Sequence, residues 1–273
     1  MAGVTNRAAM GEALLTFDEH CDAIVAQTDL LARHAEGADP AAPVPTCPGW
    51  DLGRLLRHVG ADHRWAEEIV RTRATRPIDD DSVDDPDAYA DVAPSALGRW
   101  LVEGAAALAD TLRAAGPGVP VWTPADEQLI EQSTRFWARR MAYETLLHRA
   151  DAALVTGAEF VADERLAADA VEEWLEFSTV PEAYEPQPGV PELLGPGRAL
   201  HFDAGRAGEW LLDLGGERPR WRRGGGAATA GVRGPVTDLL LFLYARPAPG
   251  VGTRGDSELL DLWLERTRFW LEL

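Results

Sequence analysis

Two side chains that can bind a metal lie one helical turn apart in the segment RRMAYETLLHRAD. Glu144 and His148 are four residues apart, a spacing that places both on one face of a helix. A carboxylate and an imidazole held in this way can share one divalent ion. The same spacing also occurs in helices without a metal. Arg140 can meet an anionic substrate group, but an ion pair with Glu144 is the commoner role for an arginine at this position.

A third candidate ligand, His58, lies in the segment LLRHVGADHRW. It shares a helical stripe with Asp62 and has apolar neighbours, so we expect it to face the interior of a helical bundle. Two imidazoles and one carboxylate form a ligand set that suits catalytic zinc and leaves a position for water or substrate. Asp62, four residues after His58, and Asp151, three after His148, are placed to accept a hydrogen bond from the second ring nitrogen of each histidine.

The elements that must position these residues are helices. Apolar residues recur at helical spacing in five segments, which predicts helices at about 9–35, 51–74, 94–115, 129–156 and 163–178. Asp51 is the expected N-cap of the second helix, and Gly157 ends the fourth. Four or five antiparallel helices joined by such connections predict a bundle.

The pattern changes after the proline-rich stretch VPEAYEPQPGVPELLGPG. ALHFDA, GEWLLDL, PRWRRG and TAGVRG read as short strands, and two helices follow, in PVTDLLLFLYARP and in DSELLDLWLERTRFWLEL. We therefore predict two domains: a metal-binding helical bundle at 1–182 and a small C-terminal α+β domain at 195–273.

Composition narrows the classes of partner. A net charge of −19 argues against nucleic acid and anionic membranes. The chain has no lysine, which excludes Schiff-base lysine chemistry and a Walker-type phosphate loop. No membrane span and no signal layout are apparent, so we expect a cytoplasmic protein. Of the two cysteines, Cys47 can be a reactive thiol, although the interpretation as a small packed residue is favoured.

Several motifs occur in the order of a known family. The loop VPTCPGWDLGRLLRHVGADHRWA, the helix RRMAYETLLHRADAALVTG and the segment AGVRGPVTDLLLFLYARP together resemble the mycothiol-dependent maleylpyruvate isomerase-like family, within the wider DinB/YfiT-like metal-binding bundles. The resemblance runs over nearly the whole chain. It implies metal ligands at His58, Glu144 and His148. Where the family often has His just before the metal glutamate, this chain has Tyr143, so the substrate preference need not transfer.

The resemblance implies a zinc enzyme, with Fe²⁺ or Ni²⁺ as alternative metals, that uses mycothiol as a thiol cosubstrate. The thiolate would attack a small electrophilic substrate, either at a double bond, as an isomerase, or with loss of a leaving group, as an S-transferase. Arg222 and Arg223 are weak candidates for contact with an anionic substrate, because a basic strand end is the simpler explanation. We expect a monomer or a homodimer.

Other functions fit the same ligands. Two histidines and one carboxylate also form the facial triad of non-haem iron oxygenases, and a metal site of this kind can activate water for hydrolysis. A third possibility is a non-catalytic module that binds a metal or an apolar ligand. Four tryptophans of the C-terminal domain could line a pocket, although core packing is the commoner role: Trp210, Trp221, Trp263 and Trp270.

Overall fold

The computed structural model describes residues 15–78, 89–124, 130–180 and 190–267, and the chain folds into two compact units. One unit is the uninterrupted segment 16–161, and the other combines residues 1–15 with 162–273. The predicted division instead places the fifth helix with the bundle, so the domain boundaries at 182 and 195 stay a prediction. No helix in the described ranges is both long and apolar enough to cross a membrane.

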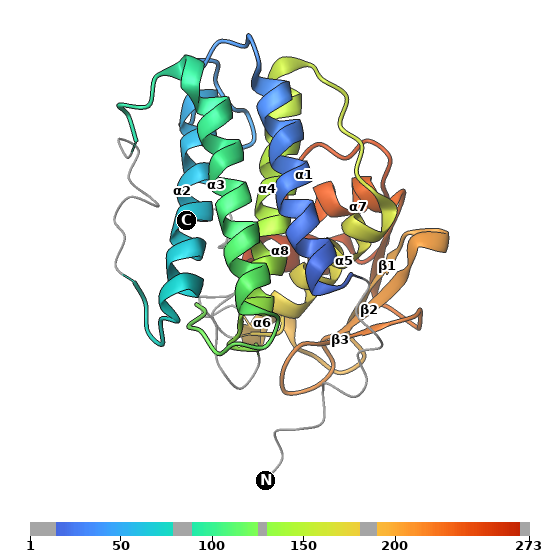
Figure 1. The fold of residues 1–273 in the computed structure, drawn as a ribbon. Coiled ribbons are helices and arrows are strands. Elements are labelled where there is room, and N and C mark those ends of the chain that lie inside the picture. Colours follow the sequence, from blue (N-terminus) through green and yellow to red (C-terminus); the bar gives the residue numbers. More distant parts are fainter. Residues whose placement is uncertain (1–14, 79–88, 125–129, 181–189, 268–273) are drawn as a thin grey trace. The chain divides into compact units, whose positions relative to one another are not determined.

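Four long helices form the first unit: α1 (Phe17–Ala35), α2 (Leu52–Thr72), α3 (Pro94–Ala115) and α4 (Thr134–Thr156). The helices α1 and α4 pack together, as do α2 and α3, and the two pairs join through α1 with α3 and α2 with α4. Figure 1 shows the four running side by side. At the contact between α2 and α3, a side chain at Gly60 would overlap the Trp100 ring, so this close approach requires glycine.

Local sequence signals explain where these helices begin and end. Thr16 and Glu19 form a capping box at the start of α1, and the Asp51 side chain caps α2 by accepting from the Arg54 amide at 2.7 Å. Gly157 adopts φ 69° at the C-terminus of α4, a left-handed conformation that glycine takes without strain. Leu31, Leu55 and Leu101 lie in the buried core between the helices.

In its described residues, the second unit contains a five-stranded mixed sheet and four helices. The sheet order is β3-β2-β1-β4-β5, with β1 (Ala199–Asp203) parallel to β4 (Ala230–Arg233) and all other pairs antiparallel. The remaining strands are β2 (Glu209–Asp213), β3 (Arg220–Arg223) and β5 (Gly252–Gly255). The helices are α5 (Glu164–Phe177), α6 (Val190–Leu193), α7 (Val236–Leu243) and α8 (Ser257–Thr267), with a short 3₁₀ turn, η2 (Gly205–Ala207).

This arrangement confirms the predicted fold class, a four-helix bundle followed by a small α+β domain. The four strand-like segments form β1 to β4. Trp210, Trp221 and Trp263 are buried, and Trp263 packs against Phe202 with ring centroids 5.3 Å apart, as expected of core residues. Trp270 lies outside the described residues.

Candidate metal centre

The helices α2 and α4 bring the three predicted ligands together. His148 Nε2 lies 2.9 Å from Glu144 Oε1, and His58 Nε2 lies 3.5 Å from the same oxygen. One ligand atom from each residue falls within 4.8 Å of the other two. The side chains of His58 and Glu144 keep 16% and 18% of their surface exposed, whereas that of His148 keeps 7%. The cluster is therefore largely buried but retains contact with solvent.

Asp151 lies behind His148, on the side away from Glu144. Its Oδ2 is 2.9 Å from His148 Nδ1, and its side chain is fully buried. A hydrogen bond from Nδ1–H to this carboxylate leaves the Nε2 lone pair directed at the other ligand atoms. This is the arrangement that the spacing of three residues predicts.

Asp62 lies in a different place from the one that its spacing suggests. Its Oδ2 approaches His58 Nε2 at 3.4 Å, the same nitrogen that faces Glu144. The carboxylate is thus beside the ligand atom of His58 rather than behind its second nitrogen. Asp62 adds a second negative charge to the cluster.

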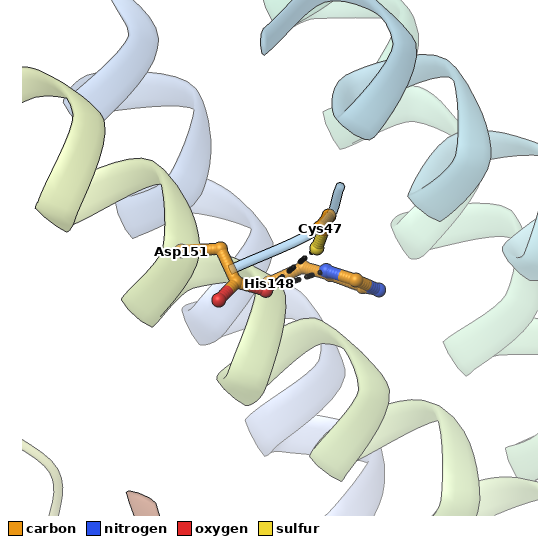
Figure 2. A group of neighbouring side chains, drawn as sticks. All are labelled: Cys47, His148 and Asp151. Carbon is orange, nitrogen blue, oxygen red and sulfur yellow. Dashed lines mark hydrogen bonds and ion pairs between the residues drawn. The ribbon is translucent and has the colours of Figure 1, made fainter. Parts of the chain in front are cut away.

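The loop PVPTCPGW between α1 and α2 also contributes to the site, as Figure 2 shows for Cys47. The loop is closed by hydrogen bonds from the Val44 amide to the Trp50 carbonyl and from the Trp50 amide to the Cys47 carbonyl. Thr46 Oγ1 donates to Asp151 Oδ1 at 2.6 Å, and Cys47 Sγ lies 3.6 Å from Asp151 Oδ2. Cys47, His148 and Asp151 form a second group of closely spaced ligand atoms.

Trp50 of the same loop lies against both histidines. Its ring meets that of His58 edge to face, with centroids 4.8 Å apart, and it is stacked with that of His148 at 6.0 Å. Sequence reasoning missed Thr46 and Trp50 and favoured a packing role for Cys47. One signal was present: the loop ends at Asp51, the N-cap of α2, and must therefore lie close to the first turns of that helix.

Burial and neighbouring charges set the ionisation of the ligands. Burial disfavours the Glu144 carboxylate, but Arg140 and the hydrogen bonds from His148 and His58 hold the pKa of Glu144 well below its usual range. Burial likewise disfavours the His148 imidazolium, yet its bonds to Asp151, Cys47 and Glu144 raise the pKa of His148 well above its usual value.

On α2 the pKa shifts again result from burial and from neighbouring charges that oppose it. Burial raises the pKa of Asp62 to about 6, against the opposing effect of His58. Burial works to lower the pKa of His58, but Asp62 and Glu144 together raise it. Without a metal, the histidines of the cluster therefore favour their protonated forms. A cation that binds there must displace these protons.

The arginines named in the sequence analysis are engaged in contacts of their own. Arg140 forms an ion pair with Glu144, one turn along α4. Arg223 forms an ion pair with Glu172, and Arg222 donates to carbonyls of the turn that follows β3. These contacts explain all three arginines without a substrate, so a substrate-binding role for Arg140, Arg222 and Arg223 stays a prediction.

Other histidines pair outside the cluster. His63, on α2, lies with Nε2 2.8 Å from the Thr145 hydroxyl, and burial lowers its pKa to about 3. His20 Nε2 lies 3.0 Å from the hydroxyl of Tyr143, which is fully buried. Tyr143 therefore points away from the ligands, as its position in the helix predicts.

Comparison with known proteins places the site in a family context. Residues 21–153 match the family described as the mycothiol maleylpyruvate isomerase N-terminal domain, and this range contains every candidate ligand. Two crystal structures share the fold: the mycothiol-dependent maleylpyruvate isomerase and a mutant of it with one histidine replaced by alanine. Each has a TM-score of 0.60 and 16% identity, over 88% of this chain and 93% of the other. No curated protein matches the chain in sequence.

Proposed function

We propose that this chain, whose helical unit belongs to the mycothiol maleylpyruvate isomerase family, binds one zinc ion on His58, Glu144 and His148 and uses it with a low-molecular-weight thiol such as mycothiol. The observation that carries the proposal is the convergence of three ligand atoms within 4.8 Å of one another, from two helices far apart in sequence. An accidental Glu–His pair on one helix would not explain the third residue.

The residues present fit such an ion. Two imidazole nitrogens and one carboxylate oxygen are a usual set for zinc in a catalytic site, with a position left for another ligand. Zinc bound there would supply a Lewis acid that keeps a coordinated thiol ionised at neutral pH. Arg140 keeps Glu144 charged, and Asp151 orients the His148 ring. The Trp50 ring packs against both imidazoles.

The substrate is a small electrophile. A thiolate that adds to an activated double bond permits rotation about the resulting single bond and leaves again, so the thiol is regenerated and the product is an isomer. A thiolate that displaces a leaving group stays in the product, so the thiol is consumed. We favour the isomerase, because the family and both structural neighbours are described by that reaction. The cysteines are free thiols, which suits a reducing cytoplasm.

The first experiment measures metal content by elemental analysis of the untagged protein as purified, beside His148→Ala and, as a matched control, His34→Ala from α1 of the same unit. We expect about one zinc per chain in the wild type and the control, and none in His148→Ala. Iron with oxygen consumption would instead identify an oxygenase. No metal in the wild type, even after zinc is supplied, would overturn the proposal.

The second experiment tests the thiol. Turnover of maleylpyruvate by the zinc-loaded protein is followed with and without mycothiol, and the free thiol is counted at the end. Loss of turnover without the thiol, and an unchanged amount of thiol after turnover, is the result expected of an isomerase. Stoichiometric consumption of thiol would identify a transferase. Undiminished turnover without any thiol would show that metal-activated hydrolysis or another reaction takes place.

A further inference from the structure

The loop between α1 and α2 holds a residue of α4 from the side opposite the ligand cluster. Thr46 donates to Asp151 Oδ1 at 2.6 Å, and the Cys47 thiol approaches Asp151 Oδ2 at 3.6 Å. Asp151 is fully buried, while both loop residues are half-buried. A buried carboxylate is costly unless donors surround it, so these contacts help to fix both its charge and its orientation.

Asp151 in turn fixes the imidazole of His148. The 2.9 Å contact to Nδ1 uses the same Oδ2 that the Cys47 thiol approaches, and Thr46 occupies the other oxygen. The carboxylate therefore cannot turn about its own axis without losing the Thr46 bond. With the Asp151 carboxylate fixed, the His148 ring keeps Nε2 directed at Glu144, 2.9 Å away.

We propose that Thr46 and Cys47 are positioning residues, which hold Asp151 so that His148 presents Nε2 to the metal. This inference rests on the proposed function, because it assigns to the loop the control of metal affinity at that site. Neither residue touches the three ligand atoms of the cluster in this scheme. The orientation of the His148 ligand on α4 therefore depends on the loop that connects α1 and α2.

A competing interpretation makes Cys47 a metal ligand itself, together with His148 and Asp151, whose ligand atoms also lie within 4.8 Å of one another. We favour the positioning role because a set of two histidines and one carboxylate is already complete on the Nε2 side of His148. With Nε2 on the metal, Nδ1 can donate to Asp151, 2.9 Å away. This role accounts for the contacts of Asp151 with Cys47 and with His148 (Figure 2).

The test compares Thr46→Val, which removes the hydroxyl at nearly constant shape, with Thr46→Ser, which keeps it. Thr28→Val is the matched control, since Thr28 is a fully buried threonine of α1 whose hydroxyl donates along its own helix, to the Ile24 carbonyl. Zinc affinity is measured by competition with a chelator. Exchange of the His148 Nδ1 proton with solvent is followed by NMR in the metal-free protein, and the resonance is assigned by its absence in His148→Gln.

We expect Thr46→Val to lower zinc affinity about 10- to 100-fold and to speed exchange of the Nδ1 proton, with wild-type behaviour in Thr46→Ser and Thr28→Val. Cys47→Ala should lower affinity less than about tenfold, because a thiol is a weak donor. Zinc affinity and proton exchange that stay at wild-type values in Thr46→Val would overturn the proposal. A sulfur-to-metal charge-transfer band in the cobalt-substituted protein that disappears in Cys47→Ala would also overturn it, in favour of a Cys47 ligand.

The exchange measurement separates this inference from the proposed function. If the wild type binds no zinc, the proposed function fails, yet the Nδ1 proton of the metal-free protein still reports whether Thr46 holds Asp151 against His148. If zinc binds and Thr46→Val changes neither quantity, the function stands and the positioning role fails.

Discussion

Each unit of the molecule has a largely buried glutamate on a helix, and the partners of the two carboxylates differ in kind. Glu172, on α5, accepts two bonds from the guanidinium of Arg223, at 2.6 and 2.7 Å, and one from the Trp210 indole at 2.8 Å. Glu144, on α4, has Arg140 at one oxygen, whereas two histidine nitrogens face the other. The partners of Glu172 are permanent hydrogen-bond donors. The partners of Glu144 include donors that can become metal ligands.

The two sites differ in whether the partners of the carboxylate can give up a proton. The guanidinium of Arg223 and the indole of Trp210 are donors at any physiological pH, so the Glu172 contacts do not depend on the loss of a proton. An imidazole nitrogen donates when it carries a proton and offers a lone pair when it does not. The cluster around Glu144 can therefore exchange protons for a cation with little change in shape. Burial of an acid does not by itself mark a functional site, but burial against histidines indicates one.

Exchange of each carboxylate for an amide gives the sharpest test of this comparison, and the largest effect. We expect Glu144→Gln to lower zinc affinity by more than about 100-fold, because it removes a charged ligand. It should also lower the free energy of unfolding of the metal-free protein, because the Glu144 carboxylate is paired with Arg140 and His148. Glu172→Gln should keep the zinc affinity and lower the free energy of unfolding by about 2 kcal/mol, through its weakened bonds to Arg223.

Chelator competition and urea unfolding of the metal-free variants supply the two measurements. The comparison breaks down if Glu172→Gln loses zinc while it remains folded. It also breaks down if Glu144→Gln keeps the wild-type zinc affinity, since Glu144 would then serve the fold and not the metal.

The pH dependence of zinc affinity sharpens the comparison next. The pKa of His148 is raised well above its usual value, so a proton must leave the ring when zinc binds at neutral pH. Zinc affinity should therefore rise with pH by about tenfold per pH unit for each proton displaced, and level off above the pKa of His148. Zinc binding at each pH is measured against a chelator of known affinity. A flat profile would mean that His148 is already neutral in the free protein.

The smallest expected effect concerns His63, a buried histidine that faces a hydroxyl instead of a carboxylate. Burial lowers its pKa to about 3, below the value of about 6.5 expected in the unfolded chain. As pH falls below 6.5 the unfolded state takes up the proton first, so the stability that His63 contributes is complete above 6.5 and is lost in more acidic solution.

We therefore expect the free energy of unfolding of the wild type to fall by about 2 kcal/mol relative to His63→Gln between pH 7 and pH 5. Urea unfolding at the two values measures the change. A constant difference between the proteins would show that His63 is solvated or partnered in a way that its contact with Thr145 does not suggest.

Much of this molecule follows from residue spacing. The intervals between Glu144, His148 and Asp151 fix their relative positions on one helix, and the structure places them accordingly. Asp51 and Gly157 were expected helix ends, and they cap α2 and α4. Such predictions hold because the regular geometry of a helix fixes the relative positions of residues that are close in sequence.

Contacts between segments distant in the chain could not be predicted in the same way. Thr46 meets Asp151 across 105 positions of sequence, and nothing in its own neighbourhood indicates that partner. Asp62 was assigned to the wrong side of His58 because spacing alone does not give the rotation of a ring about its bond. The strand β5, with the sequence GTRG, has little intrinsic strand preference and exists through its pairing with β4.

All residues of the candidate centre fall between positions 46 and 151, inside the uninterrupted segment 16–161 that forms the helical unit. The other unit is assembled from both sides of that segment. A recombination event that exchanges everything after residue 161 would thus transfer the complete ligand set to a new partner domain. The residues of the candidate centre can therefore be inherited together, while the rest of the chain changes independently.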